Sequence, residues 1–156
     1  MHIADPQTIA ERVVDKMTAD DAFSRWLGIE TFDVAPGRAS CRMTVRADMV
    51  NGFGTGHGGI AYSLADSAFA FATNNCGRLS VAIDCSVSYP AAVRPGDVLT
   101  ATAVQESSSR KLAFCTVTVR NQHDVTVLHF RGTVYRTAVD HIPVLGHTLG
   151  AEKDQP

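Results

Sequence analysis

The sequence of 156 residues lacks any long apolar run, and this absence excludes a large class of proteins. A membrane-spanning helix needs about 20 consecutive apolar residues, and no segment of the chain approaches that length. The first 21 residues carry five acids, so we do not expect them to be a signal peptide. The sequence therefore predicts a soluble cytoplasmic protein with no membrane partner.

The sequence also lacks a strong net charge and paired cysteines. The formal net charge is −2, so no nucleic-acid partner is expected. The four cysteines lie far apart and form no C-x-x-C pair, which disfavours metal clusters and redox motifs. We expect them to be free thiols.

The spacing of apolar residues changes along the chain, from a helical repeat near the N-terminus to alternation further on. Asp5-Pro6 is typical of a helix start, an apolar stripe at helical spacing follows it, and a second short helix is expected to end at Gly28. From Ile29 the apolar residues alternate, which indicates strands. These strands are expected as a hairpin within 29–45 and as single segments over 81–89, 97–105, 111–120 and 125–136.

Between the strands lies one long apolar helix, which follows the glycine-rich stretch at 51–59. Its alanines recur at helical spacing, and such small side chains let a sheet approach closely, so the helix should be buried. The layout predicts an α+β domain with one antiparallel sheet. We expect an N-terminal helical segment over 1–27, the main domain over 28–137 and a loosely ordered tail over 138–156.

Residues 51–74, NGFGTGHGGIAYSLADSAFAFATN, resemble the signature of the hotdog-fold acyl-CoA thioesterases, in the branch related to phenylacetic acid degradation. The resemblance extends over residues 20–137. It implies a sheet wrapped around the long helix, and an enzyme that hydrolyses aryl (phenylacetyl or hydroxyphenylacetyl) or small to medium acyl-CoA thioesters. It also implies a homodimer, usually paired into a homotetramer, and no cofactor beyond the coenzyme A of the substrate.

One carboxylate, Asp66, lies in the middle of the apolar helix, and no other acid occurs between Asp48 and Asp84. An ionised carboxylate is costly to bury unless it is paired or faces a cavity. The resemblance makes Asp66 the catalytic carboxylate, as a nucleophile or as a base that activates water. The alternative is a structural hydrogen bond to a neighbouring hydroxyl such as Ser63 or Ser67, or an exposed position for Asp66.

The first turn of the helix offers hydrogen-bond donors, because its N–H groups have no partner inside the helix. A thioester is hydrolysed through a tetrahedral oxyanion, so we expect the Gly58 N–H to bind that oxyanion. Gly59 leaves room for the substrate to approach. We expect a structural or substrate-orienting role for His57, with a general acid as the alternative. Asn51 either donates to the thioester carbonyl or closes its own turn.

Spacing along the helix predicts a shared site. Gly58 and Asp66 are eight residues apart, which is about 12 Å along one helix. Both must lie within about 3–3.5 Å of one thioester, which a single chain cannot achieve. Two antiparallel copies of the helix meet this condition, so each dimer would carry two identical sites. No metal site is expected, because His57 and Asp66 lie too far apart.

The other candidate residues concern substrate binding. Three aromatic residues flank Asp66 or the glycine turn and either line an acyl pocket or belong to the core: Phe53, Tyr62 and Phe69. Three basic residues on expected turns either meet the coenzyme A phosphates or are ordinary solvated charges: Arg94, Arg110 and Lys111.

The resemblance also leaves one group unassigned. Some relatives carry a hydroxyl residue four positions after the acid to hold water, and this chain has Ala70 there. Ser63 and Ser67 are weaker candidates for that role.

Two other functions are compatible with the same fold. A hotdog enoyl-thioester dehydratase needs a histidine base with a glutamate, and the long helix contains neither. A non-catalytic acyl-CoA sensor coupled to transcription needs a DNA-binding module, for which residues 1–27 are too short and too acidic. Hydrolysis is the leading prediction, and non-catalytic acyl-CoA binding is the alternative.

Overall fold

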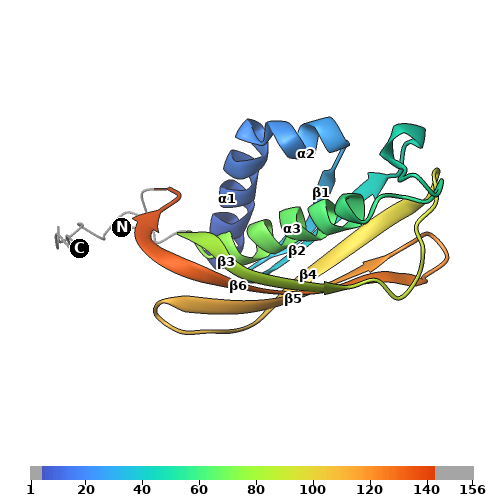
Figure 1. The fold of residues 1–156 in the computed structure, drawn as a ribbon. Coiled ribbons are helices and arrows are strands. Elements are labelled where there is room, and N and C mark those ends of the chain that lie inside the picture. The colour runs from blue at the N-terminus through green and yellow to red at the C-terminus, as the bar shows by residue number, and fades with distance from the viewer. Residues whose placement is uncertain (1–4, 143–156) are drawn as a thin grey trace.

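The computed structural model describes residues 5–142, and its centre is a six-stranded antiparallel sheet that curves around one long helix (Figure 1). The strands are β1 (Glu30–Ala35), β2 (Arg38–Thr44), β3 (Arg78–Ser88), β4 (Val98–Ser108), β5 (Leu112–Arg120) and β6 (Thr126–Asp140). Their order across the sheet is β1-β2-β4-β5-β6-β3, so β1 and β3 are the edges. The helices are α1 (Pro6–Asp20), α2 (Ala22–Leu27), the short 3-10 helix η1 (Ala47–Met49) and the long α3 (Gly58–Asn74). The predicted α+β hotdog architecture is confirmed.

The N-terminal helices begin and end where the local signals predict. The Asp5 side chain caps α1 by accepting hydrogen bonds from the N–H groups of Gln7 and Thr8. Gly28 ends α2 in the left-handed conformation, with φ of 75°. Both helices lie on the same side of the sheet as α3 (Figure 1), and α1 contacts both α3 and β1.

Small side chains bring α3 close to the sheet. Four alanines at helical spacing on α3 are at most 2% exposed: Ala61, Ala65, Ala68 and Ala72. The helix contacts all six strands. A glycine on β6 makes room for Phe69, because a Cβ on Gly132 would lie 2.6 Å from the Phe69 ring. The predicted buried helix therefore packs against the sheet through small residues and buried phenylalanines.

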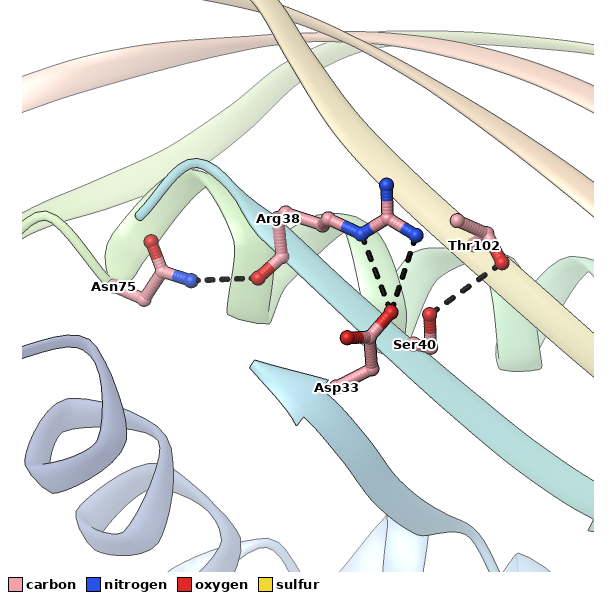
Figure 2. Close-up of polar contacts among 5 residues, drawn as sticks. All are labelled: Asp33, Arg38, Ser40, Asn75 and Thr102. Carbon is pink, nitrogen blue, oxygen red and sulfur yellow. Dashed lines mark hydrogen bonds and ion pairs between the residues drawn. The ribbon is translucent and has the colours of Figure 1, made fainter. Parts of the chain in front are cut away.

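Two asparagines at the C-terminal end of α3 fasten the helix to both edges of the sheet. The fully buried Asn75 donates to the carbonyls of Ala35 and Arg38 (2.8 and 2.9 Å) and accepts from the Gly37 N–H (2.8 Å). Figure 2 shows its amide beside the Arg38 carbonyl. This one side chain therefore holds the β1–β2 turn against the helix.

Asn74 acts in the same way at the other edge. Its side-chain oxygen accepts from the Ser80 N–H (2.7 Å), and its amide donates to the Ser80 carbonyl (3.2 Å). The same oxygen lies 2.6 Å from His141 Nε2, just after β6. Because the β1–β2 hairpin and β3 are at opposite edges, the C-terminal end of α3 is bonded to both edges of the curved sheet.

The boundaries differ from the sequence-based expectation at the end of β6. This strand continues to Asp140, past the expected end at 136, because Asp140 still pairs with Arg78 at the start of β3. The expected tail therefore does not begin at 138. Most of that tail lies outside the described residues. In the described part, no helix is long and apolar enough to cross a membrane.

The Asn75 contacts predict a large loss of stability on truncation. Asn75→Ala leaves buried backbone groups of the β1–β2 turn without partners, which should lower the free energy of unfolding by about 2–3 kcal/mol. Asn121→Ala is the matched control, since Asn121 accepts from the N–H groups of His123 and Val125 in an exposed turn. Urea unfolding should show a loss below about 1 kcal/mol for the control. Equal losses for the two variants would contradict the role assigned to Asn75.

Candidate active site

A tight loop leads into α3, and Asn51 holds it closed. The side-chain oxygen of Asn51 accepts from the N–H groups of Phe53 (2.9 Å) and Thr55 (3.3 Å), and its amide donates to the Thr55 hydroxyl (3.0 Å). Val50 and Gly56 also form an isolated β-bridge. Of the two roles left open for Asn51, the single chain shows turn closure.

The loop packs tightly against the connection between β3 and β4. The Gly56 N–H donates to the Val93 carbonyl at 2.7 Å. A Cβ on Gly56 would lie only 2.8 Å from a Val93 methyl carbon, so only glycine fits without a shift. This contact fixes the position of the loop just ahead of the first turn of α3.

The first peptide of α3 is held from both sides. His57 caps the helix, because its Nδ1 accepts from the Gly59 N–H at 2.9 Å. The Tyr89 hydroxyl donates to the Gly58 carbonyl at 3.2 Å, and a Cβ on Gly58 would lie 3.4 Å from the Tyr89 ring. The Gly59 N–H is therefore occupied, and His57 has a structural role. No acceptor among residues 5–142 takes the Gly58 N–H, which remains a free donor at the positive end of the helix dipole.

Asp66 lies in the middle of α3, half-buried, and its carboxylate has no hydrogen bond or ion pair within the described part of the chain. The serines that were its alternative partners bond elsewhere. The Ser63 hydroxyl donates to the Gly59 carbonyl (2.7 Å), and the Ser67 hydroxyl lies 2.9 Å from that of Ser24 on α2. The structural alternative for Asp66 is therefore not observed. Burial raises the pKa of this carboxyl group.

Two neutral proton donors accompany Asp66. Tyr62 lies one turn before it on α3, and Cys85 approaches from β3. Burial raises the pKa of Tyr62 to about 12, with Cys85 and Asp66 adding to the shift. Burial also raises the pKa of the Cys85 thiol, and the nearby carboxylates of Asp66 and Asp84 oppose its ionisation further. A phenol and a thiol therefore stay protonated beside a carboxylate, which suits them to donate hydrogen bonds to a bound water or substrate.

Cys85 and Tyr89 were missing from the candidates found by sequence reasoning. Both lie on the segment 81–89 that was expected to be a strand, where residues four positions apart share a face, and this was the available signal. What it could not show was that β3 runs beside α3, so that Cys85 meets Asp66 and Tyr89 covers Gly58.

The three aromatic candidates do not come together. Phe69 is 1% exposed, and its ring lies 5.1 Å from that of Phe130 between centroids, so it belongs to the core. Tyr62 packs edge-on against the same Phe130 ring at 5.7 Å and is half-buried beside Asp66. Phe53 is 93% exposed on the loop. The expectation that Phe69 lines an acyl pocket is not met in the single chain, and Phe130 occupies the space beside its ring.

The three basic candidates divide between the two ends of α3. Arg94 follows Val93, which contacts the glycine loop at the N-terminal end of the helix. Arg110 and Lys111 form the β4–β5 turn, and their carbonyls accept from Arg78 (3.3 Å) and Arg136 (2.8 Å) near the C-terminal end of α3. Residues 5–142 contain no cluster of three metal-ligating side chains.

Comparison with known proteins identifies the family. The sequence profile of the Thioesterase superfamily matches residues 53–128. The acyl-coenzyme A thioesterase PaaI of Escherichia coli is 38% identical over 120 residues, which cover 77% of this chain and 86% of that protein. The chain belongs to the thioesterase superfamily, in the PaaI branch. A putative esterase of Archaeoglobus fulgidus is 35% identical over 135 residues and covers 86% of this chain and 88% of its own.

Solved structures agree with this placement in the PaaI branch. The structure of E. coli PaaI, from the phenylacetic acid degradation operon, has a TM-score of 0.85 at 34% identity and covers 87% of this chain and 99% of that one. A protein of Thermus thermophilus, TT0310, has a TM-score of 0.72 at 41% identity, with 75% and 98% coverage. The predicted enzyme class, a thioester hydrolase, is confirmed with the family.

The surroundings of Asp66 predict that its charge lowers stability. Because burial raises its pKa in the folded state, the ionised carboxylate costs free energy of folding at neutral pH. Asp66→Asn should therefore raise the free energy of unfolding by about 0.5–2 kcal/mol. The gain should shrink as the pH falls through the raised pKa towards the unfolded value. Thermal unfolding between pH 4 and 8 measures this, with Asp15→Asn on the exposed face of α1 as a control that should change little. A gain that does not depend on pH would exclude the charge as its source.

Proposed function

We propose that the protein hydrolyses acyl-coenzyme A thioesters to the free acid and coenzyme A. The observation that carries the proposal is the unpartnered, half-buried carboxylate of Asp66, on the same helix whose first N–H, at Gly58, is also free. We further propose aryl acyl groups, phenylacetyl or hydroxyphenylacetyl, or small to medium acyl groups as substrates. The name of E. coli PaaI as an acyl-coenzyme A thioesterase, and its operon, support this choice.

Each group of the site has a role in such a reaction. Asp66 takes a proton from water as that water attacks the carbonyl carbon, or attacks the carbon itself. Its raised pKa brings it closer to the working pH, which favours proton transfer. The Gly58 N–H binds the oxyanion, and the C–S bond breaks when the intermediate collapses. If Asp66 is the base, the proton that it took from water then passes to the sulfur, which restores the enzyme. If Asp66 attacks the carbon, the coenzyme A thiolate leaves and an acyl-Asp66 anhydride forms. Water then hydrolyses this anhydride to the free acid and the carboxylate, and the proton released passes to the thiolate.

The proposed reaction needs two chains, because Gly58 and Asp66 are about 12 Å apart on one helix. The long edge strand β3 offers the surface for a second chain, since nothing in the described part pairs with its outer side. Val81 and Ile83 on this strand are 48% and 59% exposed. We propose a homodimer in which two antiparallel α3 helices place Gly58 of one chain opposite Asp66 of the other, with two such dimers forming a tetramer.

A panel of acyl-CoA substrates tests the activity through the free thiol that hydrolysis releases. The wild-type protein should hydrolyse at least one member, with kcat/KM highest for aryl or small to medium acyl groups. Asp66→Asn should lower kcat by about 10²–10⁴, the range for a positioned acid–base group. Asp15→Asn should leave kcat unchanged. Thiol release from no substrate, or an Asp66→Asn variant with more than half of the wild-type kcat, would refute the proposal.

Subunit complementation tests the shared site. Gly58→Val should inactivate one half-site, because the new side chain meets the Tyr89 ring and crowds the free donor. Asp66→Asn should inactivate the other half-site. In a mixed dimer one site carries both lesions and the other carries neither. Random 1:1 assembly makes half of the dimers mixed, so about a quarter of wild-type activity should return.

Each variant alone should be nearly inactive. Co-expression with two affinity tags secures the mixed dimer even if folded dimers do not exchange subunits. A doubly tagged mixed dimer without activity would mean that both groups serve the site of one chain.

A further inference from the structure

Four basic side chains from three parts of the chain gather at the β4–β5 turn. We call them the turn cluster: Arg78, Arg110, Lys111 and Arg136. The whole chain has a formal net charge of −2, so this concentration of positive charge is local. None of the four takes part in an ion pair within the described residues.

Hydrogen bonds to the turn fix two of these arginines. Arg136 on β6 donates from its guanidinium to the Ser109 carbonyl (2.8 Å), and Arg78 on β3 donates to the Arg110 carbonyl (3.3 Å). Each guanidinium keeps further N–H groups free, because it has five donors. Asp140 lies opposite Arg78 in the register of β3 and β6, but the two side chains form no ion pair. Within residues 5–142, no ion pair therefore neutralises the positive charges of the cluster.

The position of the cluster relative to Asp66 suits one particular ligand. Arg78 begins β3 two residues before Ser80, which is bonded to Asn74 at the end of α3. Asp66 and Asn74 are eight residues apart, which is about 12 Å along the helix. Coenzyme A carries its phosphates at the far end of the pantetheine arm from its sulfur. A thioester at Asp66 therefore needs an anion-binding group well away from the carboxylate, in the region where the turn cluster lies.

Arg94 does not meet this requirement. It follows Val93, which is hydrogen-bonded to Gly56, two residues before the proposed oxyanion donor Gly58. A basic residue there lies near the thioester end of the substrate.

We propose that the turn cluster binds the 3′-phosphate and diphosphate of coenzyme A, and so selects coenzyme A thioesters over thioesters of pantetheine. The proposal rests on the proposed acyl-CoA thioesterase activity. Arginine forks bind phosphate oxygens in pairs, and Lys111 adds a point charge. Because the phosphates lie far from the reacting carbonyl, their contacts stabilise the ground and transition states alike, which acts on KM rather than on kcat.

The test compares three substrates that share one acyl group: acyl-CoA, acyl-3′-dephospho-CoA and acyl-pantetheine. The main variant is Arg110→Glu/Lys111→Glu, since both side chains are exposed and neither has a hydrogen-bond partner in the described part of the chain. Its KM for acyl-CoA should rise by about 10–100-fold, with kcat nearly unchanged. Its KM for acyl-pantetheine should stay at the wild-type value. Removal of the 3′-phosphate should raise the KM of the wild type and have a smaller effect on the variant.

Variants with a single charge reversal control for the effect of a changed net charge. Arg110→Glu and Lys111→Glu each change the net charge by as much as Arg12→Glu on the exposed face of α1. The two cluster variants should raise the KM for acyl-CoA, and Arg12→Glu should not. An unchanged KM in the double variant, or a rise seen only in Arg94→Glu, would overturn the proposal while hydrolysis itself persists. If the wild type hydrolyses neither acyl-CoA nor acyl-pantetheine, the proposed function fails instead.

Discussion

The rigidity of α3 is the constraint on which the rest of the molecule depends. Its alanine stripe lets the sheet close around it, and Asn74 and Asn75 tie its last turn to both sheet edges. Because α3 is one continuous helix from Gly58 to Asn74, Gly58 and Asp66 lie about 12 Å apart along it. Because no motion of one chain brings them together, a site that uses both groups has to be built from two helices. The unpaired edge at β3 then provides the surface that a second chain needs.

In the proposed mechanism, the groups around α3 that are assigned to catalysis are not the ones that stabilise the fold. The His57–Gly58 peptide carries the free Gly58 N–H, and its carbonyl accepts from the Ile60 N–H at 2.9 Å. The next peptide is held by His57 and Tyr89, so the free N–H has a fixed direction before any substrate binds. Donors fixed in this way need no reorganisation during the reaction. Asp66 lacks such partners, and its burial raises its pKa. The ionised Asp66 lowers the free energy of unfolding, and the apolar core around α3 offsets this loss.

The parts of the fold that follow from local chemistry could be predicted from the sequence. The cap at Asp5, the left-handed Gly28 and the buried α3 are set by residues close in the chain. Alternation located the strands, but strict alternation would put Ile83 on the same face as Cys85. A bulge between Ala82 and Asp84 breaks the alternation and leaves Ile83 59% exposed. The contacts of Cys85 and Tyr89 could not be predicted, because they depend on which strand lies beside α3.

The two proposals together assign different tasks to the two ends of α3. The end that Asn74 and Asn75 tie to the sheet lies beside the turn cluster, where the phosphates are proposed to bind. The other end carries the glycine loop, where a small backbone group has to approach the thioester closely. In a shared site, the chain that supplies Asp66 also supplies the phosphate contacts, and its partner supplies the oxyanion donor. A substrate whose phosphates are bound by one chain would then react only when the start of the partner's α3 helix is in place. Substrate binding and dimer formation would therefore be coupled.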